Sequence, residues 1–113
     1  MKLDFDFLRC KIGSNSFTRL DTSLSVEKLD SLGQLNDDMF IGEYPNGLSL
    51  SIDWSSFESF TSDQGPYILK GFIVSLARSY DWNFTVLRWL ARDFDELIDV
   101  LKRVDDWAMS VKS

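Results

Sequence analysis

Residues 39–54, MFIGEYPNGLSLSIDW, predict the β-hairpin on which the fold prediction rests. Pro45 fixes one φ angle, and Asn46-Gly47 tolerates the positive φ angles of a tight turn. Apolar and polar residues alternate in the second arm, so we expect one face of this strand in the core and the other in water. The apolar set is Leu48, Leu50, Ile52 and Trp54, and the polar set is Ser49, Ser51 and Asp53.

The residues before this hairpin predict one clear strand, one weaker strand and a short helix. Residues 2–7 alternate charged and apolar side chains, as a half-buried strand does. Residues 13–16, Gly-Ser-Asn-Ser, indicate a turn, and a second strand is expected over residues 17–20. Ser25 can cap a helix over residues 26–32, and Gly33 suits the left-handed position after its last turn.

The residues after the hairpin predict a loop, two strands and a long helix. The polar stretch 55–65 is interpreted as a loop. Residues 67–77 fit either a helix or a strand, and their β-branched and aromatic content favours a strand that turns over residues 79–83 into a second strand over 84–90. Asp93 and Glu96 form a capping-box-like start for a C-terminal helix, supported by an Asp99–Arg103 pair.

Together these elements predict a single α+β domain over residues 1–113. We expect an antiparallel sheet of about five or six strands, with the C-terminal helix packed across it and a short helix in the N-terminal third. The length of 113 residues and a hydrophobic fraction of 44% suffice for one core.

Several kinds of chemistry lack the residues that they need. The chain has no histidine and one cysteine, Cys10, which excludes histidine-based catalysis and nearly every zinc site. Phosphate-binding glycine motifs are also missing. Carboxylate pairs such as Asp4 with Asp6, or Asp37 with Asp38, are the remaining catalytic device, and acids on the wet face of a strand are ordinarily only solvated. We therefore predict no enzymatic activity, no cofactor and no metal site.

The negative charge is concentrated in the middle of the chain. The net charge is -6, and residues 29–69 contain seven acids and no Lys or Arg. These acids are Asp30, Asp37, Asp38, Glu43, Asp53, Glu58 and Asp63. Such a segment repels nucleic acid and attracts a positively charged protein, whose association it accelerates. We predict a basic protein partner and no direct contact with nucleic acid.

The contact surface is predicted to combine this charge with neighbouring aromatic anchors, because buried aromatic residues supply much of the affinity of protein interfaces. The candidate partner-binding residues are Asp37, Asp38, Glu43, Tyr44, Asp53, Phe57, Glu58 and Asp63. For the aromatic members the alternative is a place in the core.

The N-terminal sequence and the apolar runs bear on location. The alternation of residues 1–7 does not resemble a signal peptide, and the apolar runs are too short for a membrane span. A lone cysteine agrees with a reducing compartment. We expect a cytoplasmic protein that does not enter a membrane.

Three stretches resemble the small immunity proteins of bacterial toxin–immunity pairs, including those of contact-dependent growth inhibition. They are the start KLDFDF (residues 2–7), the acidic hairpin DDMFIGEYPNG (37–47) and the run RDFDEL (92–97). The resemblance implies a cytoplasmic inhibitor that binds one cognate toxin domain, often a basic nuclease, and occludes its active site or a neighbouring surface.

Two other classes compete with this interpretation. Secretion chaperones and assembly adapters are also small and acidic, and they are often dimeric; the C-terminal helix would then form the dimer face. A small enzyme that uses carboxylates alone is the third class. The strand-like start favours the inhibitor, for which we expect a monomer.

Overall fold

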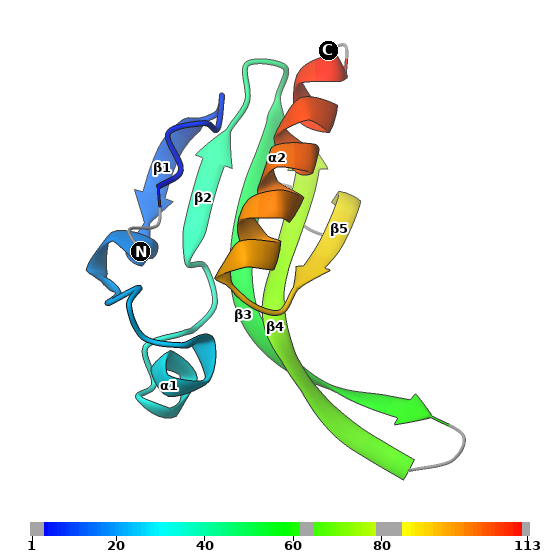
Figure 1. The fold of residues 1–113 in the computed structure, drawn as a ribbon. Coiled ribbons are helices and arrows are strands. Elements are labelled where there is room, and N and C mark those ends of the chain that lie inside the picture. Colours follow the sequence, from blue (N-terminus) through cyan, green and yellow to red (C-terminus); the bar gives the residue numbers. More distant parts are fainter. Residues whose placement is uncertain (1–3, 62–64, 79–84, 112–113) are drawn as a thin grey trace.

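A computed structural model describes residues 4–61, 65–78 and 85–111, with the backbone alone for residues 57–61 and 65–69. Its five-stranded antiparallel sheet has the order β1-β2-β3-β4-β5 (Figure 1). The strands are β1 (Lys11–Asn15), β2 (Phe40–Glu43), β3 (Leu48–Thr61), β4 (Gly65–Arg78) and β5 (Thr85–Ala91), and the helices are η1 (Ser16–Arg19), α1 (Val26–Ser31) and α2 (Phe94–Ser110). The predicted α+β class is confirmed.

The β2–β3 hairpin forms where the turn sequence predicts it. Phe40 pairs with Ile52 and Glu43 with Ser49, while Gly47 adopts a φ of 88° in the turn. The side chain of Asn46 accepts a hydrogen bond from the N–H of Leu48 and donates to two carbonyl groups at the end of α2. The turn residues therefore also fix the C-terminal helix.

Both predicted helices are confirmed together with their caps. The Ser25 side chain accepts a hydrogen bond from the N–H of Lys28, and Gly33 follows α1 with a φ of 70°. Asp93 accepts from the N–H of Glu96 at the start of α2. Nη2 of Arg103 lies 3.4 Å from Oδ2 of Asp99, so the predicted i,i+4 ion pair forms.

The N-terminal prediction is wrong in its strands. Residues 4–10 contain no strand, and the first one lies at Lys11–Asn15, where residues 13–16 were expected to turn. Residues 17–20, expected as a strand, belong largely to the helix η1. Phe5 is nevertheless buried, at 4% exposure. The alternation identified a core side chain, but it carries no information about which backbone segment pairs with β2.

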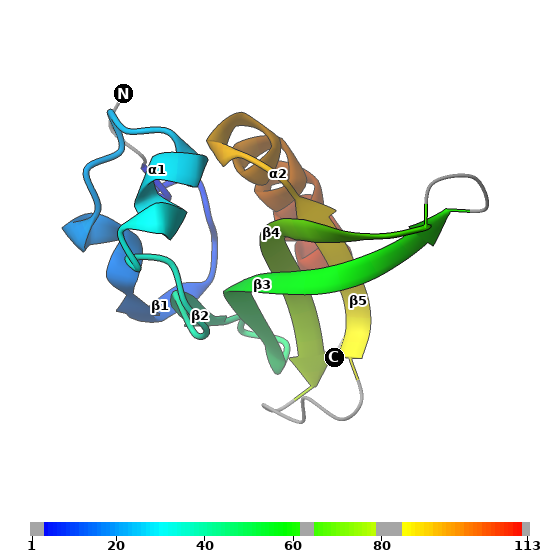
Figure 2. The same cartoon turned by 90° about the horizontal axis from the view of Figure 1, so that it is seen from below.

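The loop predicted over residues 55–65 is also wrong for residues 55–61 and 65, which are strand, whereas residues 62–64 lie outside the described residues. β3 pairs with β4 from Leu48 opposite Arg78 to Thr61 opposite Gly65. β2 ends its pairing at Ile52 and β5 at Phe72, so the outer parts of β3 and β4 form a two-stranded ribbon beyond the sheet. Figure 2 shows this ribbon extending away from the helices. Continuous pairing outweighs the polar composition here.

The strand interpretation of residues 67–77 is confirmed, since β4 spans Gly65–Arg78. The next predicted strand, over residues 84–90, is confirmed as β5 from Thr85 onward. The turn expected over residues 79–83 lies outside the described residues.

One face of the sheet carries the core. α2 crosses this face (Figure 1), and the predicted apolar residues of β3 are all buried in the core, with Trp54 at 9% exposure. The N-terminal segment and α1 join the same core through Phe5, Phe17 and Leu29. None of the helices in the described part of the chain is long and apolar enough to cross a membrane.

The opposite face of the sheet is not covered by α2, yet the β3 serines on it are less exposed to solvent than predicted. Ser49 and Ser51, expected in water, are 0% and 4% exposed. Their side chains are short and lie between the flanking strands β2 and β4, which shield them.

Candidate functional site

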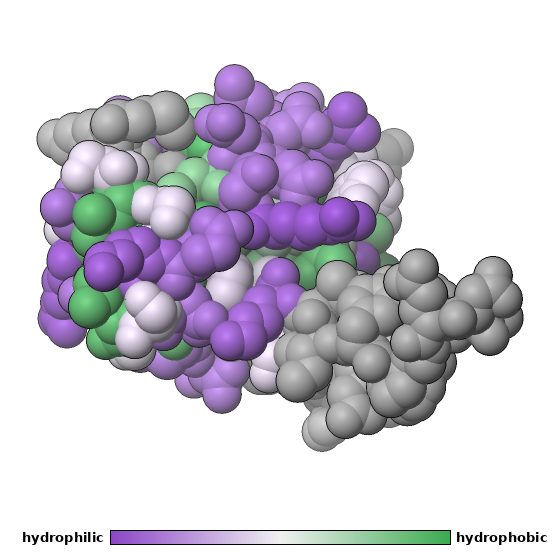
Figure 3. All heavy atoms as spheres, turned by 60° about the horizontal axis from the view of Figure 1, so that its bottom comes forward, coloured by the Kyte–Doolittle hydropathy of each residue, from purple (hydrophilic) through white to green (hydrophobic). Residues whose placement is uncertain are grey.

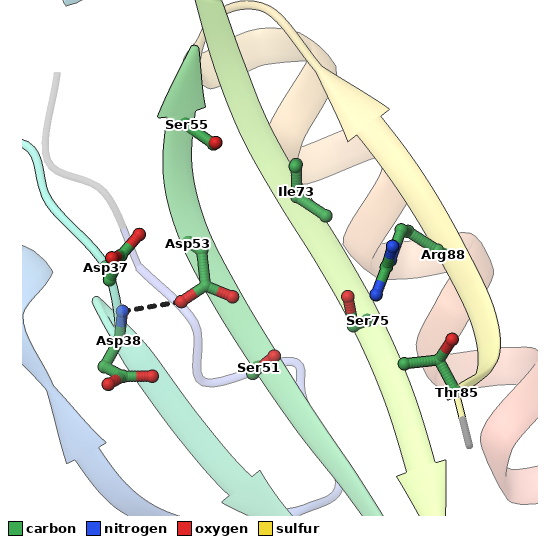
Figure 4. A pocket seen from close by; sticks show the side chains of 9 residues that line it. All are labelled: Asp37, Asp38, Ser51, Asp53, Ser55, Ile73, Ser75, Thr85 and Arg88. Carbon is green, nitrogen blue, oxygen red and sulfur yellow. Dashed lines mark hydrogen bonds between the residues drawn. The ribbon is translucent and has the colours of Figure 1, made fainter. Parts of the chain in front are cut away.

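Three of the predicted acids meet at a hollow on the open face of the sheet. Asp37, Asp38 and Asp53 line this hollow, whose volume is about 450 Å³ (Figure 4). Ser51 and Ser55 of β3 line it as well. A hollow of this size accommodates one or two side chains of a partner or a small ligand.

Backbone hydrogen bonds hold the loop with Asp37 and Asp38 against β3. The N–H of Trp54 donates to the carbonyl of Asn36 at 2.9 Å, and the N–H of Met39 donates to the carbonyl of Ile52 at 2.8 Å. Between them, the N–H of Asp38 donates to Oδ1 of Asp53 at 2.6 Å. The two loop carboxylates therefore lie beside Asp53.

The carboxyl group of Asp53 is perturbed by its surroundings. Partial burial raises the pKa of its carboxyl group above the ordinary value, and the nearby charges of Asp38 and Asp37 raise it further. Hydrogen bonds from the Asp38 amide and the Ser51 hydroxyl oppose this shift but do not cancel it. A cation bound in the hollow would favour the charged carboxylate and thus lower this pKa.

The opposite wall contributes residues that the sequence analysis did not select. Ser75 of β4, with Thr85 and Arg88 of β5, lines the hollow across from the acids (Figure 4). Register explains this placement, because Ser51 pairs with Ser75 and Ser75 with Arg88. Arg88 lies in the predicted strand 84–90, so extending the predicted strand pairing to that strand would have found it.

Glu43 lies apart from the three aspartates. It is exposed on β2 and lines a second hollow, of about 550 Å³, together with Arg9 and Lys11. Lys11 is its direct neighbour in the β1–β2 register, where opposite charges attract. Glu43, predicted to share one contact surface with Asp37, Asp38 and Asp53, therefore does not line the hollow that these aspartates form.

The prediction that Tyr44 is an anchor for a partner is corrected. The residue is 1% exposed and belongs to the core. Its hydroxyl donates to Oδ1 of Asp105 at 2.7 Å, and Asp105 also accepts from the backbone N–H and the guanidinium of Arg9. Burial and this hydrogen bond raise the pKa of Tyr44, which stays neutral. The residue joins β2, α2 and the N-terminal segment.

The remaining predicted contacts are not placed. The side chains of Phe57 and Glu58 are not described, although the backbone of both lies in β3. Asp63 lies outside the described residues.

The acidic segment does not act as one uniform patch. Asp30 of α1 accepts hydrogen bonds from Nζ of Lys70 at 2.7 Å and from Nε1 of Trp54 at 2.9 Å. These contacts, with Lys70 the larger, lower the pKa of Asp30. This acid is neutralised by a base that follows the segment in sequence, which leaves Asp37, Asp38 and Asp53 as the gathered group.

Neither a search for metal-binding groups nor comparisons with known proteins assign a further role to this site. In the described ranges, no group of three or more acidic or cysteine side chains is arranged to hold a metal ion. Comparisons with protein-family models, curated proteins and solved structures find no match to this chain.

Proposed function

We propose that this chain is a binding protein that receives a basic segment of a protein partner on the open face of its sheet. The observation that carries the proposal is the gathering of Asp37, Asp38 and Asp53 around one hollow. None of the three carboxylates forms an ion pair with a described residue, so their charge is available to a partner.

The partner class that fits best is a cognate toxin domain, and the chain then acts as an immunity protein. Proteins that act on nucleic acids present Lys and Arg to the phosphate backbone. An acidic hollow takes up such side chains and blocks the surface to which they belong. The net charge of -6 speeds the encounter with such a surface.

Two observations support a monomeric inhibitor over a dimeric chaperone. The apolar side of α2, including Leu97, Leu101 and Val104, is buried against the sheet and is not available as a dimer face. On the end of the molecule that carries α1, hydrophilic side chains predominate and apolar ones form small separate groups (Figure 3). A dimer in size-exclusion chromatography with light scattering would contradict this part of the proposal.

The partner can be captured with the tagged chain from the native host and identified by mass spectrometry. We expect one dominant basic protein. The triple variant Asp37→Asn, Asp38→Asn, Asp53→Asn should then lower the association rate about tenfold at low ionic strength and flatten its dependence on salt.

A matched control separates the local hollow from the net charge. Asp6→Asn, Glu27→Gln, Asp95→Asn removes the same charge from exposed residues that do not line the hollow. This control should change the association rate much less. Equal losses in the two variants would show that net charge alone attracts the partner, and would reject the hollow as the contact.

A further inference from the structure

The hollow has two sides of opposite charge. Asp37, Asp38 and Asp53 lie on the side of β2 and β3, whereas Arg88 lies on β5 across β4 (Figure 4). The described structure forms no ion pair between Arg88 and these acids. Because β3 and β5 are two strand spacings apart, their backbones are separated by about 10 Å. The opposite charges therefore face the hollow without neutralising each other.

Ser75 indicates that the side of the hollow that carries Arg88 can bind a ligand. This residue is 3% exposed, and its hydroxyl has no hydrogen-bond partner among the described residues. No fully buried side-chain oxygen of the described part lacks a partner, so the oxygen of Ser75 retains access to the hollow, into which it points beside Arg88 (Figure 4).

Ser75, Thr85 and Arg88 together present two hydroxyls and a guanidinium, which are donors suited to a carboxylate. A segment with positive charge alone would satisfy the aspartates but would meet Arg88 as a like charge. The arrangement thus favours a ligand that brings an anion to the β5 side.

We infer that the partner segment bound in the hollow carries both charges, a Lys or Arg that contacts the aspartates and an Asp or Glu that contacts Arg88 and Ser75. This inference rests on the proposed function and defines which basic segment is recognised. In an extended chain, two residues separated by one intervening residue project to the same side and lie about 7 Å apart. Their flexible side chains span the remaining distance.

Capped peptides test this inference without knowledge of the partner. The probe is acetyl-Gly-Lys-Ser-Glu-Gly-amide, and its two controls replace either Lys or Glu by Gln. Binding is followed by ¹⁵N-edited NMR through the amide resonances of Asp53, Ser75 and Arg88. We expect the doubly charged peptide to bind about two- to fivefold more tightly than either control, the range for solvent-exposed ion pairs.

Variants of the chain assign each charge to its side. Arg88→Gln should abolish the gain in affinity that the peptide Glu confers and should leave the gain from the peptide Lys unchanged. Asp53→Asn should reduce the gain in affinity from the peptide Lys. Arg78→Gln is the matched control, because Arg78 is an exposed base of β4 that does not line the hollow. Arg78→Gln should leave the affinity gains from the peptide Lys and the peptide Glu unchanged. Ser75→Ala should weaken only the peptides that contain Glu.

Three results would overturn the inference. If the peptide Glu adds no affinity, or Arg88→Gln and Arg78→Gln act alike, the hollow binds cations only and the proposed function stands without this refinement. If no peptide shifts the resonances of the hollow, the inference fails as well. The proposed function is judged separately, by the association rate of the captured partner.

Discussion

The backbone N–H of Asp38 donates a 2.6 Å hydrogen bond to the carboxylate of Asp53, which joins the loop before β2 to the third strand. Asp38 adopts a φ of 54°, in the left-handed region that Asp and Asn enter more readily than other side chains. The contact also holds like charges together. The fold therefore maintains an electrostatic repulsion at the hollow that a bound cation would relieve.

Partial burial, together with this repulsion, predicts for Asp53 a pH dependence opposite to that of a carboxylate stabilised by a base. Its pKa is raised in the folded chain, so the folded state binds a proton there more tightly than the unfolded state. The stability contributed by this group is thus greatest below the unfolded pKa and is lost as the pH rises through the raised pKa. Asp53→Asn should raise the free energy of unfolding near pH 7 by up to about 1 kcal/mol, the upper range for a solvent-screened charge.

Urea denaturation of the wild type and Asp53→Asn at about pH 3 and about pH 7 checks this prediction, since the gain should be small at the lower pH. Asp6→Asn, at an exposed acid outside the hollow, serves as the control and should show no such gain. A loss of stability in Asp53→Asn at neutral pH would mean that its bond to the Asp38 amide outweighs the burial and repulsion.

Asp30 should show the opposite pH dependence. Its pKa is lowered, first by the hydrogen bond from Lys70 and then by that from Trp54. Its contribution is therefore present above the unfolded pKa and disappears as the pH falls through the lowered pKa. Lys70→Met should cost about 0.2–1 kcal/mol near pH 7, since Lys70 is half exposed, and much less in acid.

Thermal and urea unfolding of Lys70→Met at two pH values measure this difference. Arg78→Gln is the control, because Arg78 forms no ion pair with a described residue. An equal effect of Lys70→Met at both pH values would show that Lys70 acts through the packing of its methylene groups and not through its charge.

Local signals predicted the fold well where they involve neighbours in sequence. Asn46-Gly47 specified its hairpin, and the caps at Ser25 and Asp93 specified where the helices begin, because these motifs satisfy backbone groups within a few residues. The strand over residues 67–77 followed from its β-branched and aromatic content.

Pairings between distant segments could not be predicted in the same way. The alternation around Phe5 marks a buried side chain, yet the strand that pairs with β2 begins at Lys11. For the site, the gathering of Asp37 with Asp53 depends on how the loop lies along β3. Arg88 reaches the hollow only through the register of β4 with β5. Both placements are tertiary and leave no local pattern.

A substitution of Tyr44 tests directly whether this residue stabilises the core or contacts the partner. Tyr44→Phe removes the hydroxyl that donates to Asp105 and keeps the buried ring. Since hydrogen bonds to charged groups are worth about 1.5–3 kcal/mol, we expect a loss of stability in this range in urea denaturation. The rate of association with the captured partner should not change. Unchanged stability with slower association would restore Tyr44 as a contact residue.

Gly42 should be required for the close approach of Cys10 to β2. A Cβ atom at this position would lie 2.7 Å from Sγ of Cys10 and 3.2 Å from Cε1 of Phe40. Because both neighbours are buried, Gly42→Ala should lower the free energy of unfolding by about 1–3 kcal/mol, the usual cost of overpacking. Urea denaturation measures this loss.

Two further variants identify its cause. Gly13→Ala is the matched control, since its added Cβ would meet only the carbonyl oxygen of Ile41 at 3.4 Å, and it should change stability by less than about 0.5 kcal/mol. Cys10→Ala removes Sγ and should recover part of the loss when combined with Gly42→Ala, so that the two substitutions are not additive. Additive losses would place the strain of Gly42→Ala at Phe40 instead of at Cys10.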